Sequence, residues 1–190
     1  DLCVKYGVII LEDNPYGELR FRGEEVPTFK SMDDEGIVIY NGSYSKVLSA
    51  GMRVGFIVAQ KDLLQRLTVA KQFSDCHSNI FFQIVTDMWL RTCDVNSHIE
   101  NIRAIYGKRC DFMLGLMEKY IDKRITFTRP DGGLFTWIEL PEYMDAKELQ
   151  MKCLDKKVAF VPGGSFFPNG GHNNTMRLNY SCMPEEKIVQ

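Results

Sequence analysis

The feature that most constrains the fold is a set of short apolar runs, rich in β-branched residues, each closed by turn residues. Gly7 to Glu12 (GVIILE) is the first run, and the polar turn segment 13–15 follows it. Gly36 to Asn41 (GIVIYN) and Arg53 to Ala59 (RVGFIVA) are the second and third. Such runs are typical of strands buried on both faces. Asp13 would then lie at the carboxyl end of a buried strand.

Helical patterns follow these runs. Apolar residues recur at steps of three and four over Asp62 to Phe73 and over about Asn96 to Tyr120, which predicts two amphipathic helices. The apolar stripe of the second helix consists of Ile99, Ile102, Tyr106, Cys110, Met113, Met117 and Tyr120. We interpret this stripe as core packing. Buried strands combined with helices indicate an α/β fold with a sheet covered on both faces.

The second helix and the change in composition after it predict two domains. A helix of about 25 residues exceeds the common helix length, so we expect it to bridge two domains. A turn cluster at 130–133 and an aromatic-rich strand at 134–140 follow it. We therefore assign residues 1–120 to a larger domain that ends in the bridging helix, and residues 121–190 to a smaller, truncated α+β domain.

The remaining patterns place further elements in the smaller domain. Residues 146–156 read as an amphipathic helix and residues 158–161 as a short strand, with a turn at 162–164. A polar loop at 169–174 precedes a strand at 176–180.

The composition favours a globular protein that binds a small molecule. The 190 residues are 45% hydrophobic and 25% charged, which suffices to bury a core. Lys and Arg total 23 against 25 Asp and Glu, a net charge of -2, so we expect neither nucleic acid nor an anionic membrane as a partner of this segment. The longest apolar stretches fall far short of the ~18 residues that a membrane span needs.

The cysteines and the first residues bear on location. The six cysteines form no C-x-x-C pair and have no histidine spaced to complete a metal site, which indicates a reduced, cytoplasmic chain without a metal. No leader of basic and then apolar residues opens the chain. It starts without Met at DLCVKYG and runs directly into the first strand, so we expect a piece of a longer protein that was cut inside a helix.

The first segment that could carry chemistry is Gly42-Ser43-Tyr44-Ser45-Lys46, with Arg53 seven residues beyond the lysine. Two hydroxyls, backbone N–H groups after a glycine and a guanidinium can together enclose a dianionic phosphate. A lysine in the same loop is placed to react with a carbonyl group near that phosphate. The alternative, from these residues alone, is a solvated lysine at a strand end with incidental serines.

Asp13 and Tyr16 form a second feature. An aspartate with little solvent at the end of a buried strand must pair with a cation or a strong donor, and a protonated pyridinium nitrogen is one such partner. Tyr16, on the turn after Pro15, could donate to a phenolic oxygen on the same ring. Taken alone, Asp13 reads more readily as a turn or helix-capping residue.

Arg177 is the third feature, because it lies inside the predicted strand at 176–180. An arginine in that position can bind a carboxylate with two parallel hydrogen bonds. The alternative is an exposed strand arginine with no ligand.

These residues occur in segments that resemble the fold-type I, class I/II aminotransferases. The resemblance is strongest to the branch that contains α-aminoadipate and kynurenine aminotransferases and the aminotransferase-like domain of MocR regulators. The matching segments, in family order across nearly the whole chain, are EDNPYGELRF, YNGSYSKVLSAGMRVGF, HIENIRAIYGKR, TRPDGGLFTWIELP, VAFVPGGSFF and MRLNYS.

The resemblance implies a role for each candidate residue. Lys46 falls on the lysine that holds pyridoxal 5'-phosphate (PLP) as a Schiff base, and Asp13 falls on the partner of the pyridine nitrogen. Tyr16 falls where the family bonds the ring oxygen. Arg177 falls where the family binds the α-carboxylate of the substrate.

The phosphate-binding positions of the family fall on Ser43, Ser45 and Arg53. One departure is Ala50, where this branch usually has a proline before Gly51. We expect this change to loosen the turn without altering a functional group.

The resemblance further implies ping-pong transfer of an amino group between an amino acid and a 2-oxo acid. The family's amino-terminal half supplies the rest of the cofactor site and much of the dimer interface, so we expect a homodimer at full length and no transamination by this piece alone. Phe135 and Trp137, together with the loop expected at Phe73 to Phe82, hint at a large or aromatic substrate side chain, although core packing explains these residues better.

Three alternatives stay open. One is the ligand-sensing domain of a MocR-type transcription regulator, which a DNA-binding domain before residue 1 would identify. Another is a different PLP reaction on the same fold, such as a lyase or decarboxylase reaction. The last is an α/β domain without a cofactor.

Overall fold

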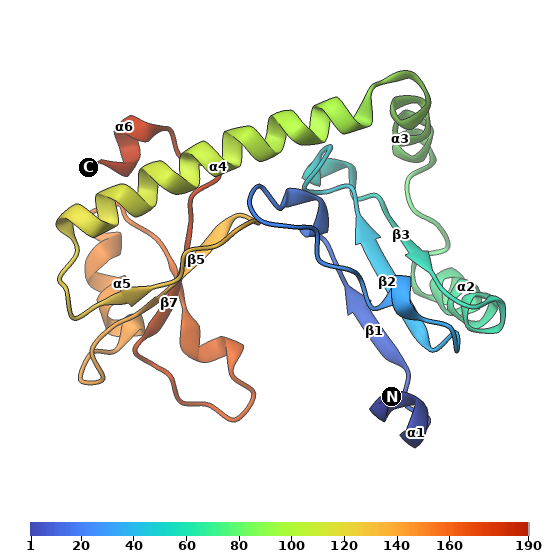
Figure 1. Cartoon of the computed structure of the whole chain (residues 1–190), viewed down its shortest axis with the longest axis horizontal. Coiled ribbons are helices and arrows are strands. Elements are labelled where there is room, and N and C mark those ends of the chain that lie inside the picture. The colour runs from blue at the N-terminus through green and yellow to red at the C-terminus, as the bar shows by residue number, and fades with distance from the viewer. Residues whose placement is uncertain (190) are drawn as a thin grey trace. The chain divides into compact units, whose positions relative to one another are not determined.

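The computed structural model describes residues 1–189 and divides into two compact units. The first unit comprises Asp1–Ile102, and the second begins at Arg103. Both units include part of the long helix α4 (Val95–Tyr120), whose bounds agree with the helix predicted from the sequence (Figure 1). The functional domain boundary that we placed after residue 120 stays a prediction.

The first unit contains a three-stranded sheet in the order β1-β2-β3. Strand β1 (Ile10–Asp13) runs parallel to β2 (Val38–Ser43), and β3 (Gly55–Val58) runs antiparallel to β2. The parallel register pairs Asp13 with Asn41. All three strands predicted from the apolar runs are therefore present, each shorter than its run or shifted along it.

Six helical segments accompany this sheet. They are α1 (Leu2–Tyr6), α2 (Lys61–Asp75), α3 (Ile80–Thr92) and three 3-10 turns, η1 (Gly17–Leu19), η2 (Lys30–Met32) and η3 (Ala50–Met52). Helix α2 agrees with the predicted helix. Helix α3 was missed, because its first residues were read as part of a loop. The signal was Asn79, whose side chain accepts hydrogen bonds from the N–H groups of Phe81 and Phe82 and so caps the helix.

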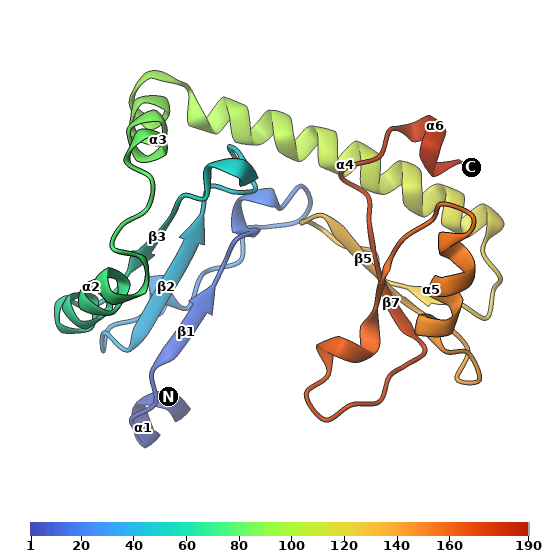
Figure 2. The ribbon, with the colours of Figure 1, turned by 180° about the vertical axis from the view of Figure 1, so that it is seen from behind.

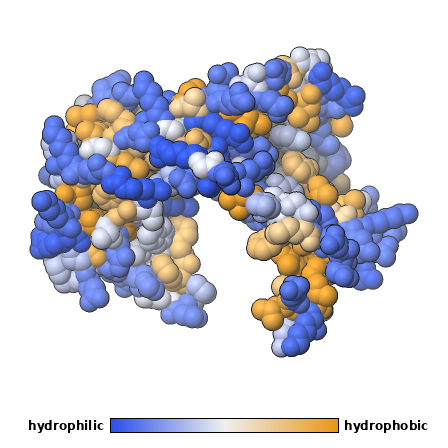
Figure 3. Space-filling model, in the orientation of Figure 1, coloured by the Kyte–Doolittle hydropathy of each residue, from blue (hydrophilic) through white to orange (hydrophobic). Residues whose placement is uncertain are grey.

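The expectation that these strands are buried on both faces is wrong for the described residues. Leu11 in β1 is 68% exposed, and every residue of β3 is exposed. Strands β1 and β3 are the two edges of a three-stranded sheet, and their apolar side chains are not covered. Apolar side chains also gather on the surface around α1 and β1 (Figure 3). An apolar run shows that a strand can be buried without showing what covers it.

The second unit contains an antiparallel sheet in the order β4-β5-β7-β6. Its strands are β4 (Thr126–Phe127), β5 (Phe135–Glu139), β6 (Val161–Pro162) and β7 (Thr175–Asn179). Its helical segments after α4 are α5 (Ala146–Leu154), η4 (Gly163–Phe166) and α6 (Glu185–Ile188). Figure 2 shows this sheet from behind.

The core of the second unit lies where α4, β5 and the segment after β7 bury their apolar side chains. Cys110, Ile138 and Tyr180 are fully buried, and Met117 is nearly so. The interpretation of the α4 stripe as core packing is thus confirmed for Cys110 and Met117. It is wrong for Tyr120, which is 68% exposed at the end of the helix.

Two local predictions in the second unit need correction. The strand predicted over residues 158–161 begins only at Val161, and residues 163–166 form η4 where a simple turn was expected at 162–164. Gly163 allows this because a Cβ there would lie 2.8 Å from Cβ of Thr175 and 2.8 Å from the Trp137 ring. The backbone of η4 therefore approaches β5 and β7 more closely than any larger residue would permit.

The helices and the potential metal ligands of the chain bear on membrane and metal binding. Among the described residues, no helix has the length and apolar character of a membrane span, and no cluster of three or more His, Cys, Asp or Glu could hold a metal ion. All six cysteines are free thiols.

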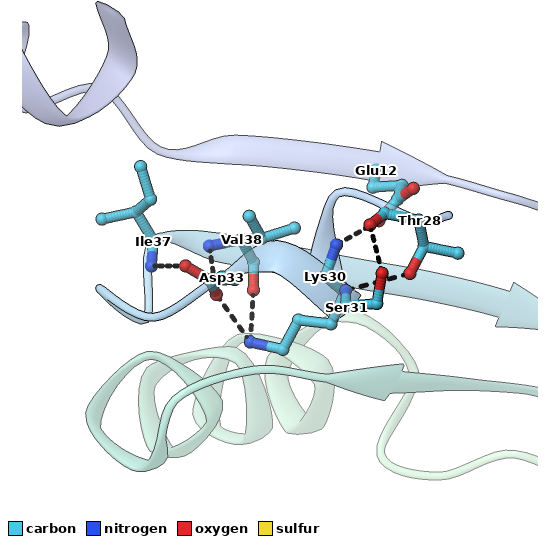
Figure 4. A network of polar contacts seen from close by, with 7 residues as sticks. All are labelled: Glu12, Thr28, Lys30, Ser31, Asp33, Ile37 and Val38. Atoms are coloured by element: carbon cyan, nitrogen blue, oxygen red, sulfur yellow. Dashed lines mark hydrogen bonds and ion pairs between the residues drawn. The ribbon is translucent and has the colours of Figure 1, made fainter. Parts of the chain in front are cut away.

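A network of polar contacts ties the connection between β1 and β2 to the sheet (Figure 4). The carboxylate of Glu12 accepts hydrogen bonds from the N–H groups of Phe29 and Lys30, both at 2.9 Å. The Lys30 ammonium donates to Asp33 at 2.9 Å and to the carbonyl of Val38 at 3.0 Å. Asp33 also accepts from the N–H groups of Ile37 and Val38. The two carboxylates thereby satisfy four backbone donors next to the strands.

We predict that Asp33→Asn lowers stability near neutral pH. The hydrogen bond from Lys30, helped by those from Val38 and Ile37, holds the pKa of the Asp33 carboxyl below its ordinary value. A carboxyl whose pKa is lowered by folding stabilises the protein above its unfolded pKa of about 3.9, and this contribution is lost as pH falls through the folded pKa. Urea unfolding of both proteins should show a difference that is full at pH 7 and shrinks below about pH 4.

The exposed neighbour Asp34 provides the control, because Asp34→Asn should leave stability unchanged across the same pH range. An Asp33→Asn protein that loses equal stability at every pH would contradict the assigned role of the charge.

We further predict that Gly163→Ala destabilises the protein by about 1–3 kcal/mol, because the new methyl group must displace Thr175 or Trp137. The matched control is Gly115→Ala in α4, where a Cβ meets nothing within 4 Å. That change should stabilise the helix by about 0.5–1 kcal/mol. Denaturant midpoints of the two variants would measure both effects, and equal midpoints would argue against the close approach.

Candidate active site

Lys46 lies in a single turn that follows β2. The carbonyl of Tyr44 accepts hydrogen bonds from the N–H groups of Leu48 at 2.8 Å and Ser49 at 3.2 Å, which closes the turn. Lys46 is half-buried in this turn. Its Nζ lies 5.8 Å from the centre of the Tyr16 ring. The amine is therefore held at the carboxyl end of β2, next to an aromatic side chain from the segment after β1.

Ser43, Ser45 and Arg53 are brought together around the same turn. The Ser43 hydroxyl accepts a hydrogen bond from the N–H of Ser45 at 3.1 Å, and Nη1 of Arg53 donates to Oγ of Ser45 at 3.4 Å. Arg53 adopts a left-handed backbone conformation with φ 55°. A residue other than glycine held there is strained, and such strain is common at functional sites.

Ala50, the departure from the family pattern, begins η3. Its carbonyl accepts a hydrogen bond from Nη1 of Arg53 at 3.1 Å. Arg53 thus donates to the backbone of the turn as well as to Ser45. A carbonyl is present whichever residue occupies position 50, so the alanine leaves this contact available.

Asp13 lies at the end of β1, directly opposite Asn41 of β2. Nδ2 of Asn41 donates to Oδ1 of Asp13 at 2.7 Å. The expectation that Asp13 has little solvent is wrong for the described residues, because its side chain is exposed. Within the described part of the chain, its second oxygen accepts no hydrogen bond and is open to a further donor. Asn41 was missed as a site residue, although the parallel pairing of the two runs would have indicated it.

Tyr16 immediately precedes the short turn η1 and is half-buried. Its backbone carbonyl accepts a hydrogen bond from the N–H of Leu19 at 2.9 Å, and Leu19 is fully buried. Burial of Leu19 therefore anchors the segment that holds the Tyr16 ring beside Lys46.

Arg177 lies in β7 of the second unit, half-buried between two aromatic rings. Its guanidinium carbon lies 4.0 Å from the centre of the Phe135 ring and 4.9 Å from that of Phe166. Its Nε is buried and has no hydrogen-bond partner among residues 1–189. The rings hold the planar group in one orientation through cation–π contact. Such a group is prepared to form two parallel hydrogen bonds with a carboxylate.

The arrangement in the first unit combines three chemical capacities. Hydroxyls and a guanidinium around one turn suit a phosphate. A carboxylate with an open oxygen suits a protonated ring nitrogen, and the half-buried amine of Lys46 suits a reactive carbonyl. Six of the seven residues predicted from the sequence therefore lie in this unit, and Arg177 lies in the other.

Comparisons with known proteins give one family. The sequence profile of aminotransferase class I and II matches residues 1–190. Aromatic-amino-acid aminotransferase 1 of Thermococcus litoralis is 43% identical over 99% of this chain and 45% of its own length. The helix-turn-helix transcriptional regulator YdfD of Bacillus subtilis is 32% identical over 94% of this chain and 37% of its own length.

A solved structure agrees with these relatives. The α-aminoadipate aminotransferase LysN of Thermus thermophilus, in complex with N-(5'-phosphopyridoxyl)-L-leucine, superposes with a TM-score of 0.94 at 38% identity. The match covers 99% of this chain and 49% of that protein, so this chain spans about half the length of its relatives. The fold-type I architecture expected from the sequence is confirmed. This chain belongs to the class I and II aminotransferase family.

Proposed function

We propose that the full-length protein containing this chain is a PLP-dependent aminotransferase that moves an amino group between an amino acid and a 2-oxo acid. The observation that carries the proposal is the position of Lys46 in the turn after β2, with Ser43, Ser45 and Arg53 around the same turn and Tyr16 beside it.

The residues present fit the cofactor. Ser43 and Ser45 offer hydroxyls, and Arg53 offers a positive charge, to a phosphate held at this turn. Asp13 offers its open carboxylate oxygen to a protonated pyridine nitrogen while Asn41 holds the other oxygen. Tyr16 offers its hydroxyl to the ring oxygen. Lys46 offers the amine that binds the aldehyde carbon.

PLP, when bound, supplies an electron sink that stabilises negative charge at the Cα of the amino acid. The residues of the protein bind and orient the cofactor and the substrate, and they move the proton. Asp13 keeps the ring nitrogen protonated, which is the state in which the ring accepts electrons. Nζ of Lys46 would act as the general base that takes the proton from the substrate Cα.

Arg177 is proposed to bind the α-carboxylate of the substrate. The support is its preset orientation between Phe135 and Phe166 and the absence of an acidic partner within the described residues. The α-carboxylate is common to amino acids and 2-oxo acids, so this group does not select the side chain. The contacts of Phe135 with Arg177, and of Trp137 with Phe166 and Phe167, support packing roles for both aromatic residues.

The finer assignments of partner and location are part of this proposal. We propose a cytoplasmic homodimer of the full-length protein. The dimer is supported by the apolar surface of the first unit, where Leu11, Phe73 and Ile80 are 68%, 89% and 62% exposed and require cover.

A regulator is the second candidate function, and the similarity to YdfD is the observation that favours it. A regulator would use the same Lys46 turn to sense the cofactor or an amino acid. A basic helix-turn-helix domain in the sequence that precedes residue 1 would favour this candidate. Amino-acid product analysis would separate transamination from a lyase or decarboxylase reaction.

We predict that Lys46→Ala abolishes the visible absorption band that the full-length protein forms with PLP. The band requires a bond between the lysine amine and the aldehyde, and alanine cannot form it. Borohydride reduction of the unchanged protein should fix the cofactor to the peptide that contains Lys46. Lys61→Ala, at an exposed lysine of α2, is the control and should retain the band. A band that survives in Lys46→Ala would refute the cofactor assignment.

We predict that Arg177→Gln raises KM for the amino acid by about a hundredfold, because the substrate loses a charged, bidentate partner. The band with PLP should remain, since Arg177 is not among the proposed cofactor ligands. Arg124→Gln removes an exposed arginine paired with Asp122 and serves as the control. Steady-state kinetics would measure both variants, and equal KM values would exclude Arg177 as the carboxylate site.

A further inference from the structure

We infer that His98 is a positioning residue for Lys46, because its Nε2 lies 2.7 Å from the carbonyl oxygen of Val47, the next residue in the turn. This inference rests on the proposed function of Lys46. It concerns a side chain 51 residues away in sequence, in the first turns of α4, that is not one of the proposed cofactor ligands.

The carbonyl of Val47 requires such a donor. Val47 lies near the end of the turn, where carbonyls lack partners in the next turn of a helix. The N–H groups of Leu48 and Ser49 donate to Tyr44, and no backbone N–H in the described part of the chain donates to Val47. Val47 is only 7% exposed. The His98 ring therefore supplies the hydrogen bond that this region of the backbone needs.

The direction of the hydrogen bond fixes which nitrogen of the His98 ring carries a proton. A carbonyl oxygen only accepts, so Nε2 must carry the proton. The ring is also held from a second side, because Trp89 of α3 packs against it edge to face, with ring centres 5.5 Å apart and planes at 82°. Two helices thus determine the orientation of the imidazole, and the imidazole fixes the carbonyl that follows Lys46.

The hydrogen bond from His98 affects how precisely the Lys46 amine is positioned. Rotation about four side-chain bonds can move the Lys46 amine relative to its Cα. The position of the amine therefore also depends on how well the backbone of the turn is fixed. Ser45 on one side of the lysine is held through Arg53 and Ser43, and Val47 on the other side is held through His98. Loss of the second restraint should leave the proposed ligands in place but misplace the amine. Small misplacements of a reacting group reduce turnover strongly.

The test compares four variants of the full-length protein. His98→Leu removes the donor, and His98→Gln keeps an N–H near the position of Nε2. His98→Asn keeps an N–H on a shorter side chain and replaces the leucine variant if that protein does not fold. His77→Leu is the matched control, because His77 is exposed and its ring nitrogen faces only the carbonyl of the adjacent Ser78.

The first readout is amide hydrogen exchange of the peptide covering residues 44–49, measured by mass spectrometry without cofactor. The restraint contributes one hydrogen bond, so exchange should accelerate about tenfold in His98→Leu and remain unchanged in His98→Gln and His77→Leu. The second readout is the half-reaction with an amino acid. Here kcat should fall at least about tenfold in His98→Leu with KM within about twofold, and His98→Gln should restore most of it.

The outcomes separate this inference from the function on which it rests. Wild-type protein without a Lys46-dependent band would overturn the proposed function and the positioning role together. An active wild type with unchanged exchange and kcat in His98→Leu would overturn the positioning role alone. Equal impairment of His98→Gln and His98→Leu would show that the donor is not what matters, and would also overturn it.

Discussion

The parallel pairing of β1 with β2 is the constraint on which the candidate site depends. Because the two strands run in the same direction, their carboxyl ends lie at the same edge of the sheet, and the register sets Asp13 opposite Asn41. The turn with Lys46 begins at Tyr44, three residues beyond Asn41 and directly after the same strand, so its distance from the Asp13 carboxylate follows from this pairing. A slip of one residue would turn each of these side chains to the other face.

The candidate catalytic and binding residues were largely predictable, because short segments of the sequence contain the residue types that their chemistry requires. Lys46 with its serines and Arg53 stand within one short segment, and the strand that holds Arg177 shows in its own alternation. Asn41 and His98 were not identified, because their contacts join segments 28 and 51 residues apart. Local patterns report which side chains share a face of one element, and they do not report which elements meet.

Burial was predicted less well than element type, and β1 and β3 show why. The same β-branched side chains that fit a pleated strand also make it apolar, so the pattern was correct about the strand and wrong about its surroundings in this chain. In the second unit, by contrast, the partners of the stripe on α4 lie within the described residues, and Cys110 and Met117 are buried as predicted. Coverage is a property of the assembled protein, whereas periodicity is a property of the segment.

The carboxylates of Glu12 and Asp33 have a consequence for how the first unit forms. Parallel strands need a long connection, which is usually a helix packed on the sheet, and here residues 14–37 contain only short 3-10 turns. Glu12 fastens Phe29 and Lys30 beside β1, and Asp33 fastens the residues that begin β2. The connection is thereby divided into two smaller loops. The entropic cost of closing it can then be offset by favourable contacts one loop at a time. The candidate site at the carboxyl ends of β1 and β2 therefore depends on contacts made near the beginning and middle of these strands.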